Sequence, residues 1–117
     1  MLTLPATVRV YVATAPVDLR KGFDGLSAVT RHVIGRNPLS GHLFLFLNRR
    51  RDRAKVLLWQ PSGFWLLYKR LEEERFVWPE AEHAVIELSV EQLHWLLAGI
   101  DLAALRPHRR LAYQRAS

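Results

Sequence analysis

The chain has 117 residues, of which 50% are hydrophobic and 24% are charged, a balance that fits one globular domain and excludes general disorder. The absence of cysteine excludes disulfides and thiolate metal sites, and the net charge of +6 favours a polyanionic partner. The N-terminus lacks the features of a secretory signal, and the longest uncharged stretch, 56–68, is too short to cross a bilayer. We therefore expect a cytoplasmic protein without membrane contact.

The charge is distributed unevenly along the chain. Residues 1–71 carry twelve lysines and arginines against three acids, residues 72–91 carry one against seven, and residues 92–117 carry four against one. Fourteen of the seventeen cations are arginines, whose planar guanidinium suits bidentate contacts with phosphate. This pattern indicates either a polyanion partner or charge that merely solubilises the protein, and the acidic stretch can also pair with the basic surface of its own fold.

The first predicted element is a strand over 8–13, where valines alternate with Arg9 and Tyr11. Between residues 18 and 34 the apolar positions recur at three- and four-residue spacing, which predicts an amphipathic helix. Asp18 suits the N-cap position of this helix, and Gly35 suits its end.

Four apolar runs follow at 42–47, 56–60, 64–70 and 75–78, and the turn residues between them predict strands joined in an antiparallel meander. In the first run, three leucines share one face and two phenylalanines share the other, so both faces of the sheet need cover. We expect the chain's own helices to cover one face. A second sheet layer, a curled barrel or another protein would cover the other.

After a further strand at 84–88, Ser89 and Gln92 match a capping box that opens a helix over 90–98. The segment 106–117 is basic and has a weak apolar pattern, which predicts a flexible tail. The sequence thus predicts one α+β domain over residues 1–105, in which an antiparallel five- or six-stranded meander sheet packs with two helices.

Six segments in a consistent order resemble a known family. They are DLRKGFDGL (18–26), SGHLFLF (40–46), KVLLW (55–59) after its arginine-rich loop, GFWLLYKRLE (63–72), RFVWP (75–79) and LLAGID (96–101). They resemble the small accessory protein, called TnpB or Orf2-like, of bacterial insertion sequences of the IS-sixty-six group. The resemblance implies a role in DNA transposition beside a separate transposase, and it brings no established catalytic site. Gln60 stands where the family often has Asp, and Glu74 stands where it tends to have Gly.

The strongest functional candidate is the predicted hairpin loop from Asn48 to Arg53, which contains four arginines. Two-stranded ribbons of this kind enter a DNA groove or hold its backbone. Near the start of the first predicted helix, two further cations lie beside N–H groups that attract anions. The alternative is a solvated tip whose charges protect the sheet edge from aggregation. The predicted DNA-binding residues are Arg49, Arg50, Arg51, Arg53, Lys55, Arg20 and Lys21.

A second set of residues is predicted to bind the transposase or another accessory subunit. Electrostatics favours placing the acidic segment 72–91, which holds seven glutamates and includes 72–74, away from an arginine loop that faces DNA. The strand aromatics are either core residues or base-stacking groups, with an exposed subset serving an interface. Homo-oligomerisation stays open. The predicted partner-binding residues are Glu72, Glu73, Glu74, Trp65 and Trp78.

No catalytic, metal or cofactor site is predicted. Asp18 and Asp24 lie roughly 240° apart around a helix and do not converge, and arginines around Asp52 would compete with a metal. The histidines show no ligand spacing of the kind that binds zinc. The hypothesis is a non-catalytic bridge between DNA and the transposase. The alternatives are a protein–protein adaptor without DNA binding and, third, a metal-dependent nuclease.

Overall fold

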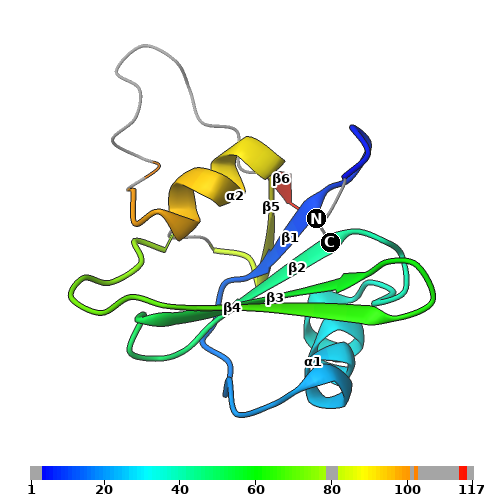
Figure 1. The fold of residues 1–117 in the computed structure, drawn as a ribbon, viewed down its shortest axis with the longest axis horizontal. Helices are drawn as coiled ribbons and strands as arrows, with labels where there is room; N and C mark the ends of the chain where they lie inside the picture. The colour runs from blue at the N-terminus through cyan, green and yellow to red at the C-terminus, as the bar shows by residue number, and fades with distance from the viewer. Residues whose placement is uncertain (1–3, 79–81, 101, 103–113, 116–117) are drawn as a thin grey trace.

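The computed structural model describes residues 4–78, 82–100, 102 and 114–115, and a mixed sheet lies between helices on its two faces (Figure 1). The strands are β1 (Val10–Ala13), β2 (Leu43–Leu47), β3 (Arg53–Trp59), β4 (Phe64–Arg70), β5 (Val85–Leu88) and β6 (Gln114–Arg115). The helices are α1 (Phe23–Val29), its π-helical continuation η1 (Thr30–Ile34), and α2 (Val90–Leu97). The six strands follow the order β4-β3-β2-β1-β5-β6.

The strand pairing departs from the expected meander at one place. The pairs β2–β3 and β3–β4 are antiparallel, as predicted, but β1 pairs with β2 in parallel, Val10 opposite Leu43. A parallel pair needs a crossover connection, and α1 with η1 supplies it here. The α+β class with two helices is therefore confirmed, whereas the purely antiparallel meander is wrong.

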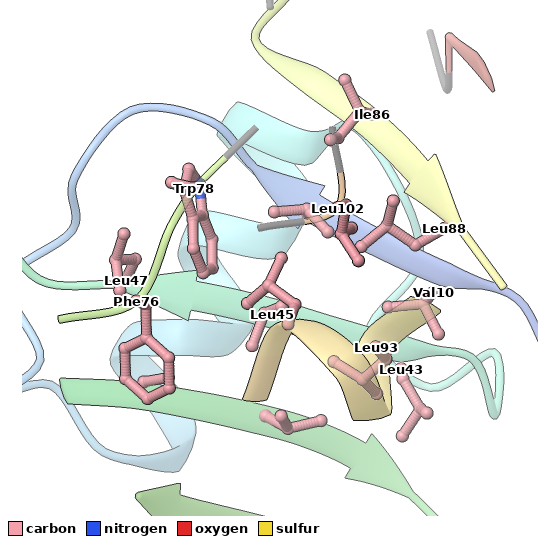
Figure 2. Close-up of a cluster of buried hydrophobic side chains, with 14 of the residues drawn as sticks. Val10, Leu43, Leu45, Leu47, Phe76, Trp78, Ile86, Leu88, Leu93 and Leu102 are labelled. Atoms are coloured by element: carbon pink, nitrogen blue, oxygen red, sulfur yellow. The ribbon is translucent and has the colours of Figure 1, made fainter. Parts of the chain in front are cut away.

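The predicted strand at 75–78 is also wrong. Residues 71–78 have no strand structure, and they cross one face of the sheet. The backbone N–H of Phe76 donates to the carbonyl of Arg51 at 2.7 Å, and the indole N–H of Trp78 donates to the carbonyl of Ala13 at 3.3 Å. Both rings are buried (Figure 2). The aromatic pattern therefore marks a segment that packs side chains on the sheet instead of pairing its backbone with a strand.

Both faces of the sheet are apolar, as the sequence predicts, and the chain itself covers both. The leucines of β2 pack on one face with α2 and the segment 71–78, and Figure 2 shows Phe76 and Trp78 close to β2. The phenylalanines of β2, Phe44 and Phe46, pack on the other face with Leu26 of α1. At β2 the second cover is thus part of this chain, and not a second sheet layer, a barrel or another protein as expected.

The ends of the helices agree with the predicted capping residues at some positions and differ at others. The capping box of α2 is confirmed, since Ser89 Oγ accepts from the N–H of Gln92 and Gln92 Oε1 accepts from the N–H of Ser89. The first helix starts at Phe23, not at Asp18, whose carboxylate bonds to Arg20 instead of capping. The helical segment ends at Gly35, where a φ of 75° favours glycine.

None of the described helices has the length and apolarity needed to cross a membrane. The tail predicted over 106–117 lies mostly outside the described residues. Its described part, Gln114–Arg115, forms β6 and pairs antiparallel with β5.

Candidate nucleic-acid interface

The loop of residues 48–53, which we call the arginine hairpin, connects β2 to β3, and one asparagine closes it. Asn48 Oδ1 accepts from the N–H groups of Asp52 and Arg53 at 3.1 and 3.0 Å, and Asn48 Nδ2 donates to Asp52 Oδ1 at 2.7 Å. The backbone N–H of Asn48 also donates to the Arg53 carbonyl at 3.1 Å. Asparagine and aspartate favour such local bonds. The loop therefore keeps its shape without using its guanidinium groups.

Backbone hydrogen bonds from the segment after β4 also fix the arginine hairpin. The N–H of Leu71 donates to the carbonyl of Asp52, and the N–H of Phe76 donates to the carbonyl of Arg51, both at 2.7 Å. Arg51 has a φ of 63°, a conformation that costs an L-residue roughly 1 kcal/mol. These bonds preorganise the hairpin, so a ligand that binds it has little backbone freedom to remove.

A pocket with a volume of about 370 Å³ lies between the arginine hairpin and the segment 16–20. Arg20 reaches it from that segment, and Arg49, Arg50 and Arg53 reach it from the hairpin. Pro16, Val17 and Leu19 add an apolar wall, and Tyr68 of β4 also lines it. We call this the arginine pocket. It brings together two predicted groups of cations that the sequence leaves about thirty residues apart.

Asp18 is the acid of the pocket lining, and it fixes Arg20. Arg20 Nη2 lies 2.7 Å from Asp18 Oδ2, and Arg20 Nε lies 3.0 Å from Asp18 Oδ1. The side-chain hydrogen bonds from Arg20, followed by its backbone N–H, hold the pKa of Asp18 well below its usual range. Asp18 therefore stays ionised and orients one guanidinium toward the pocket region.

The remaining charge of the hairpin is largely unneutralised. Among the described residues, no ion pair joins any of its four arginines to an acid. Its single acid, Asp52, is bound by Asn48, and this hydrogen bond, with the charges of Arg50 and Arg53, lowers the Asp52 pKa. Four arginines against one aspartate leave the loop with a formal charge of +3. This arrangement attracts anions with several negative oxygens.

Three of the predicted DNA-binding residues lie outside the pocket lining. Lys55 Nζ donates to the carbonyls of Leu19 and Lys21 at 2.6 and 3.0 Å, and it lies 5.1 Å from the centroid of the Tyr68 ring. It therefore ties the wall of the pocket to the sheet. Lys21 and Arg51 are exposed and do not line the pocket.

The acidic run, residues 72–74, lies beside the hairpin, contrary to the expected separation. Strand β4 returns antiparallel along β3, so it delivers the run to the end of the sheet where the hairpin lies. Glu72 Oε2 pairs with Arg70 Nε at 2.7 Å. The hydrogen bond and charge of Arg70 lower the pKa of Glu72, and the charge of Arg53 makes a smaller contribution in the same direction. Glu73 and Glu74 are exposed.

The two predicted partner-binding tryptophans lie in different environments. Trp65 is 49% exposed on β4, and its role in partner binding stays a prediction. Trp78 is only 5% exposed, because its ring packs in the core and its N–H bonds to the Ala13 carbonyl. Trp78 therefore exposes little of its ring for contact with a partner, and its partner-binding role stays a prediction.

Sequence reasoning missed two residues of this site. Asn48 carried a usable signal, because asparagine at the start of a tight hairpin commonly bonds backbone N–H groups ahead of it. Tyr68 was among the strand aromatics weighed as core or base-stacking residues, but its place at the pocket depends on the pairing of β4 with β3 and could not be predicted.

Within the described part of the chain, no three His, Asp or Glu residues cluster closely enough to hold a metal ion. Asp18 and Asp52 are engaged by Arg20 and Asn48, and Asp24 is exposed. The fourth aspartate of the chain, Asp101, lies outside the described residues.

The fold and site define an α+β domain with an arginine-lined pocket at one end of a mixed sheet. Residues 8–107 match the IS66 Orf2-like protein family, and the chain belongs to this family, which confirms the resemblance. The uncharacterized protein y4hO of Sinorhizobium fredii (strain NBRC 101917 / NGR234) is 44% identical over 101 residues, 86% of this chain and 88% of that protein. The uncharacterized protein y4jC of the same strain is 36% identical over 94 residues, 80% of each chain. No solved structure matches the chain significantly.

Proposed function

We propose that this protein is a non-catalytic accessory factor of DNA transposition that holds DNA through its arginine pocket. Membership of the IS66 Orf2-like family supports the accessory role in transposition. One observation carries the DNA contact: Arg20 and three hairpin arginines converge on one pocket although they come from separate segments. A solvated hairpin tip would need no such convergence.

The chemistry of the pocket suits a phosphodiester backbone. Guanidinium groups bind phosphate oxygens bidentately, and the apolar wall of Pro16, Val17 and Leu19 packs against a sugar. The preorganised hairpin keeps the backbone of three of the arginines in place before DNA arrives. Because phosphate contacts position a protein without reading bases, we expect binding with little sequence preference.

The second part of the proposal is a bridge to the transposase. Glu73 and Glu74 are exposed beside the hairpin, and Trp65 is exposed on β4. A partner that brings cations to the acidic run therefore lies next to the DNA held in the arginine pocket. Charge complementarity of this kind speeds encounter and selects the partner.

The alternative function is a protein–protein adaptor in which the pocket binds an acidic segment instead of DNA. A specific observation favours it: the acidic run lies directly beside the hairpin, because the N–H of Leu71 donates to the carbonyl of Asp52. The two functions differ in the ligand of the arginines, and salt dependence of DNA binding separates them.

The test uses the triple variant Arg49→Ala/Arg50→Ala/Arg53→Ala with duplex DNA across a series of salt concentrations. Each phosphate contact contributes about −0.9 to the slope of log K against log salt, so losing three flattens the slope by about 2.7. The control is Arg31→Ala, which removes an exposed arginine of η1 outside the pocket and should change the slope by no more than one contact. A folded triple variant with the wild-type slope would favour the adaptor.

A further inference from the structure

Strand β4 forms one end of the sheet, and within the described residues no strand pairs with its outer side (Figure 1). It has seven residues, contains no proline or glycine, and pairs with β3 in unbroken register from Phe64 opposite Trp59 to Arg70 opposite Arg53. Proteins usually protect such an edge with a bulge, a proline, inward charges or a short strand. Strand β4 has neither a bulge nor a proline, and its charged residues lie only at its C-terminal end.

The backbone groups that point away from β3 can be identified. At one end of the β3–β4 ladder the N–H of Gln60 donates to the carbonyl of Gly63. At the other end the N–H of Leu71 donates to the carbonyl of Asp52. Bonded and non-bonded pairs alternate along an antiparallel ladder, so odd-numbered residues of β4 bond to β3. The residues whose N–H and C=O point to the open edge are the even-numbered ones: Phe64, Leu66, Tyr68 and Arg70.

Large side chains along this edge are exposed on both faces. Trp65 and Leu67 stand opposite the buried Leu58 and Val56 of β3, yet they are 49% and 42% exposed. Tyr68, on the other face, is 54% exposed. The apolar surface of the core thus continues to the sheet edge without cover from the described chain, which is typical of a surface that associates with another chain.

The residues of β4 are arranged so that the strand complements itself. Its N-terminal half is aromatic, with Phe64 and Trp65, and its C-terminal half is cationic, with Lys69 and Arg70. An antiparallel copy centred on Leu67 would place aromatic rings opposite cations at both ends, and such pairs attract. A parallel copy would place cations next to cations.

We propose that β4 pairs antiparallel with β4 of a second copy of this chain, about a two-fold axis at Leu67. Phe64 then lies opposite the second copy's Arg70, and Trp65 lies opposite the second copy's Lys69. Every outward N–H and C=O of the four even-numbered residues finds a partner in this register. A shift of two residues, the smallest that keeps bonded residues aligned, separates both cation–aromatic pairs. Antiparallel addition to a free edge is a common mode of association.

The two-fold axis stands perpendicular to the joined sheet, so the α1 faces of the two copies lie on the same side. Tyr68, which lines the arginine pocket, lies next to the axis, opposite the second copy's Leu66. The dimer therefore presents two arginine pockets related by the axis. The pairing itself does not depend on DNA binding, because it uses the outer edge of β4 and not the arginine hairpin.

The first test is sedimentation equilibrium of the full chain across a concentration series. We expect the wild type to reach twice the 13.6 kDa of the single chain. Leu67→Lys places like charges opposite each other at the axis, so we expect the dissociation constant of the dimer to rise about tenfold or more. The control is Leu39→Lys, which changes a leucine of similar exposure, 43%, outside the sheet. Circular dichroism checks that both variants fold.

The second test fixes the register, and it uses the absence of cysteine from the chain. Under oxidation, Leu67→Cys should form a disulfide-linked dimer, because residues facing across a non-bonded antiparallel pair are close enough to link. Trp65→Cys should link poorly, since its copies lie about four residues apart along the strands, roughly 13 Å. The proposal is overturned if the wild type stays monomeric, if Leu67→Lys dimerises as well as Leu39→Lys, or if the Trp65→Cys chains link better.

Discussion

Strands β2 and β4 each begin with a run of five apolar or aromatic residues, yet the two strands are buried to very different extents. β2, LFLFL, is buried along its whole length on both faces, whereas β4, FWLLYKR, is exposed over most of its residues. Both strands end at the same end of the sheet, where β2 continues into the basic hairpin and β4 into the acidic run. An apolar strand is therefore buried or exposed according to its place in the strand order.

The largest effect is expected when a leucine of the buried strand β2 is replaced, and the comparison is with a leucine of the edge strand β4. Leu45→Ala in β2 should lower the free energy of unfolding by about 2–5 kcal/mol, because it leaves a cavity in a fully buried cluster. Leu67→Ala in β4 should lower that of the monomer by less than about 1 kcal/mol, because its side chain is already partly in water. Urea denaturation of both variants at low protein concentration measures the difference. Equal losses would mean that β4 is covered within the monomer.

The next effect concerns the oppositely charged continuations of the two strands. Glu73→Lys/Glu74→Lys should reduce capture of the transposase encoded by the same element, because the proposed bridge uses the acidic run. It should strengthen DNA binding, since the run lies beside the arginine hairpin. The matched control, Glu82→Lys/Glu91→Lys, reverses two exposed acids elsewhere in the chain. Pull-downs at low and moderate salt compare the two. If both double variants retain the transposase as the wild type does, the acidic run has no role in the bridge.

The smallest effect is a pH dependence at the other end of β2, where His42 precedes the strand. Burial lowers the pKa of His42, the charges of Arg9 and Arg36 lower it further, and Glu87 opposes them. His42 Nδ1 also accepts the N–H of Arg9 at 3.0 Å, a bond that protonation at this nitrogen would break. The unfolded chain therefore binds a proton more readily than the folded one.

The sign of this dependence follows from the lowered pKa. Stability is complete above the unfolded histidine pKa of about 6.5 and decreases as the pH falls through it. Urea denaturation between pH 7.5 and 5.5 should show this decrease in the wild type and a weaker one in His42→Asn. His32→Asn changes an exposed histidine of η1 and should keep the wild-type dependence. An unchanged dependence in His42→Asn would contradict the assignment to His42.

The sequence determined several features that depend on neighbours along the chain. The alternation of leucine and phenylalanine assigned the two faces of β2, because side chains alternate across a strand. Ser89 and Gln92 located the start of α2, because a capping box closes within one turn. The turn residues around the four arginines located the hairpin, and the ordered segments indicated the family.

Only the tertiary structure decided what depends on residues far apart in the chain. The burial of Trp78, the parallel pairing of β1 with β2 and the convergence of Arg20 with the hairpin each join segments separated by many residues. The run at 75–78 looked like a strand because aromatic residues favour strands and core packing alike. The bond from Phe76 to Arg51 and the ring of Trp78 against the core hold that run across the sheet face. Local preference is weaker than burial of these rings, and the available place for them is set by the whole fold.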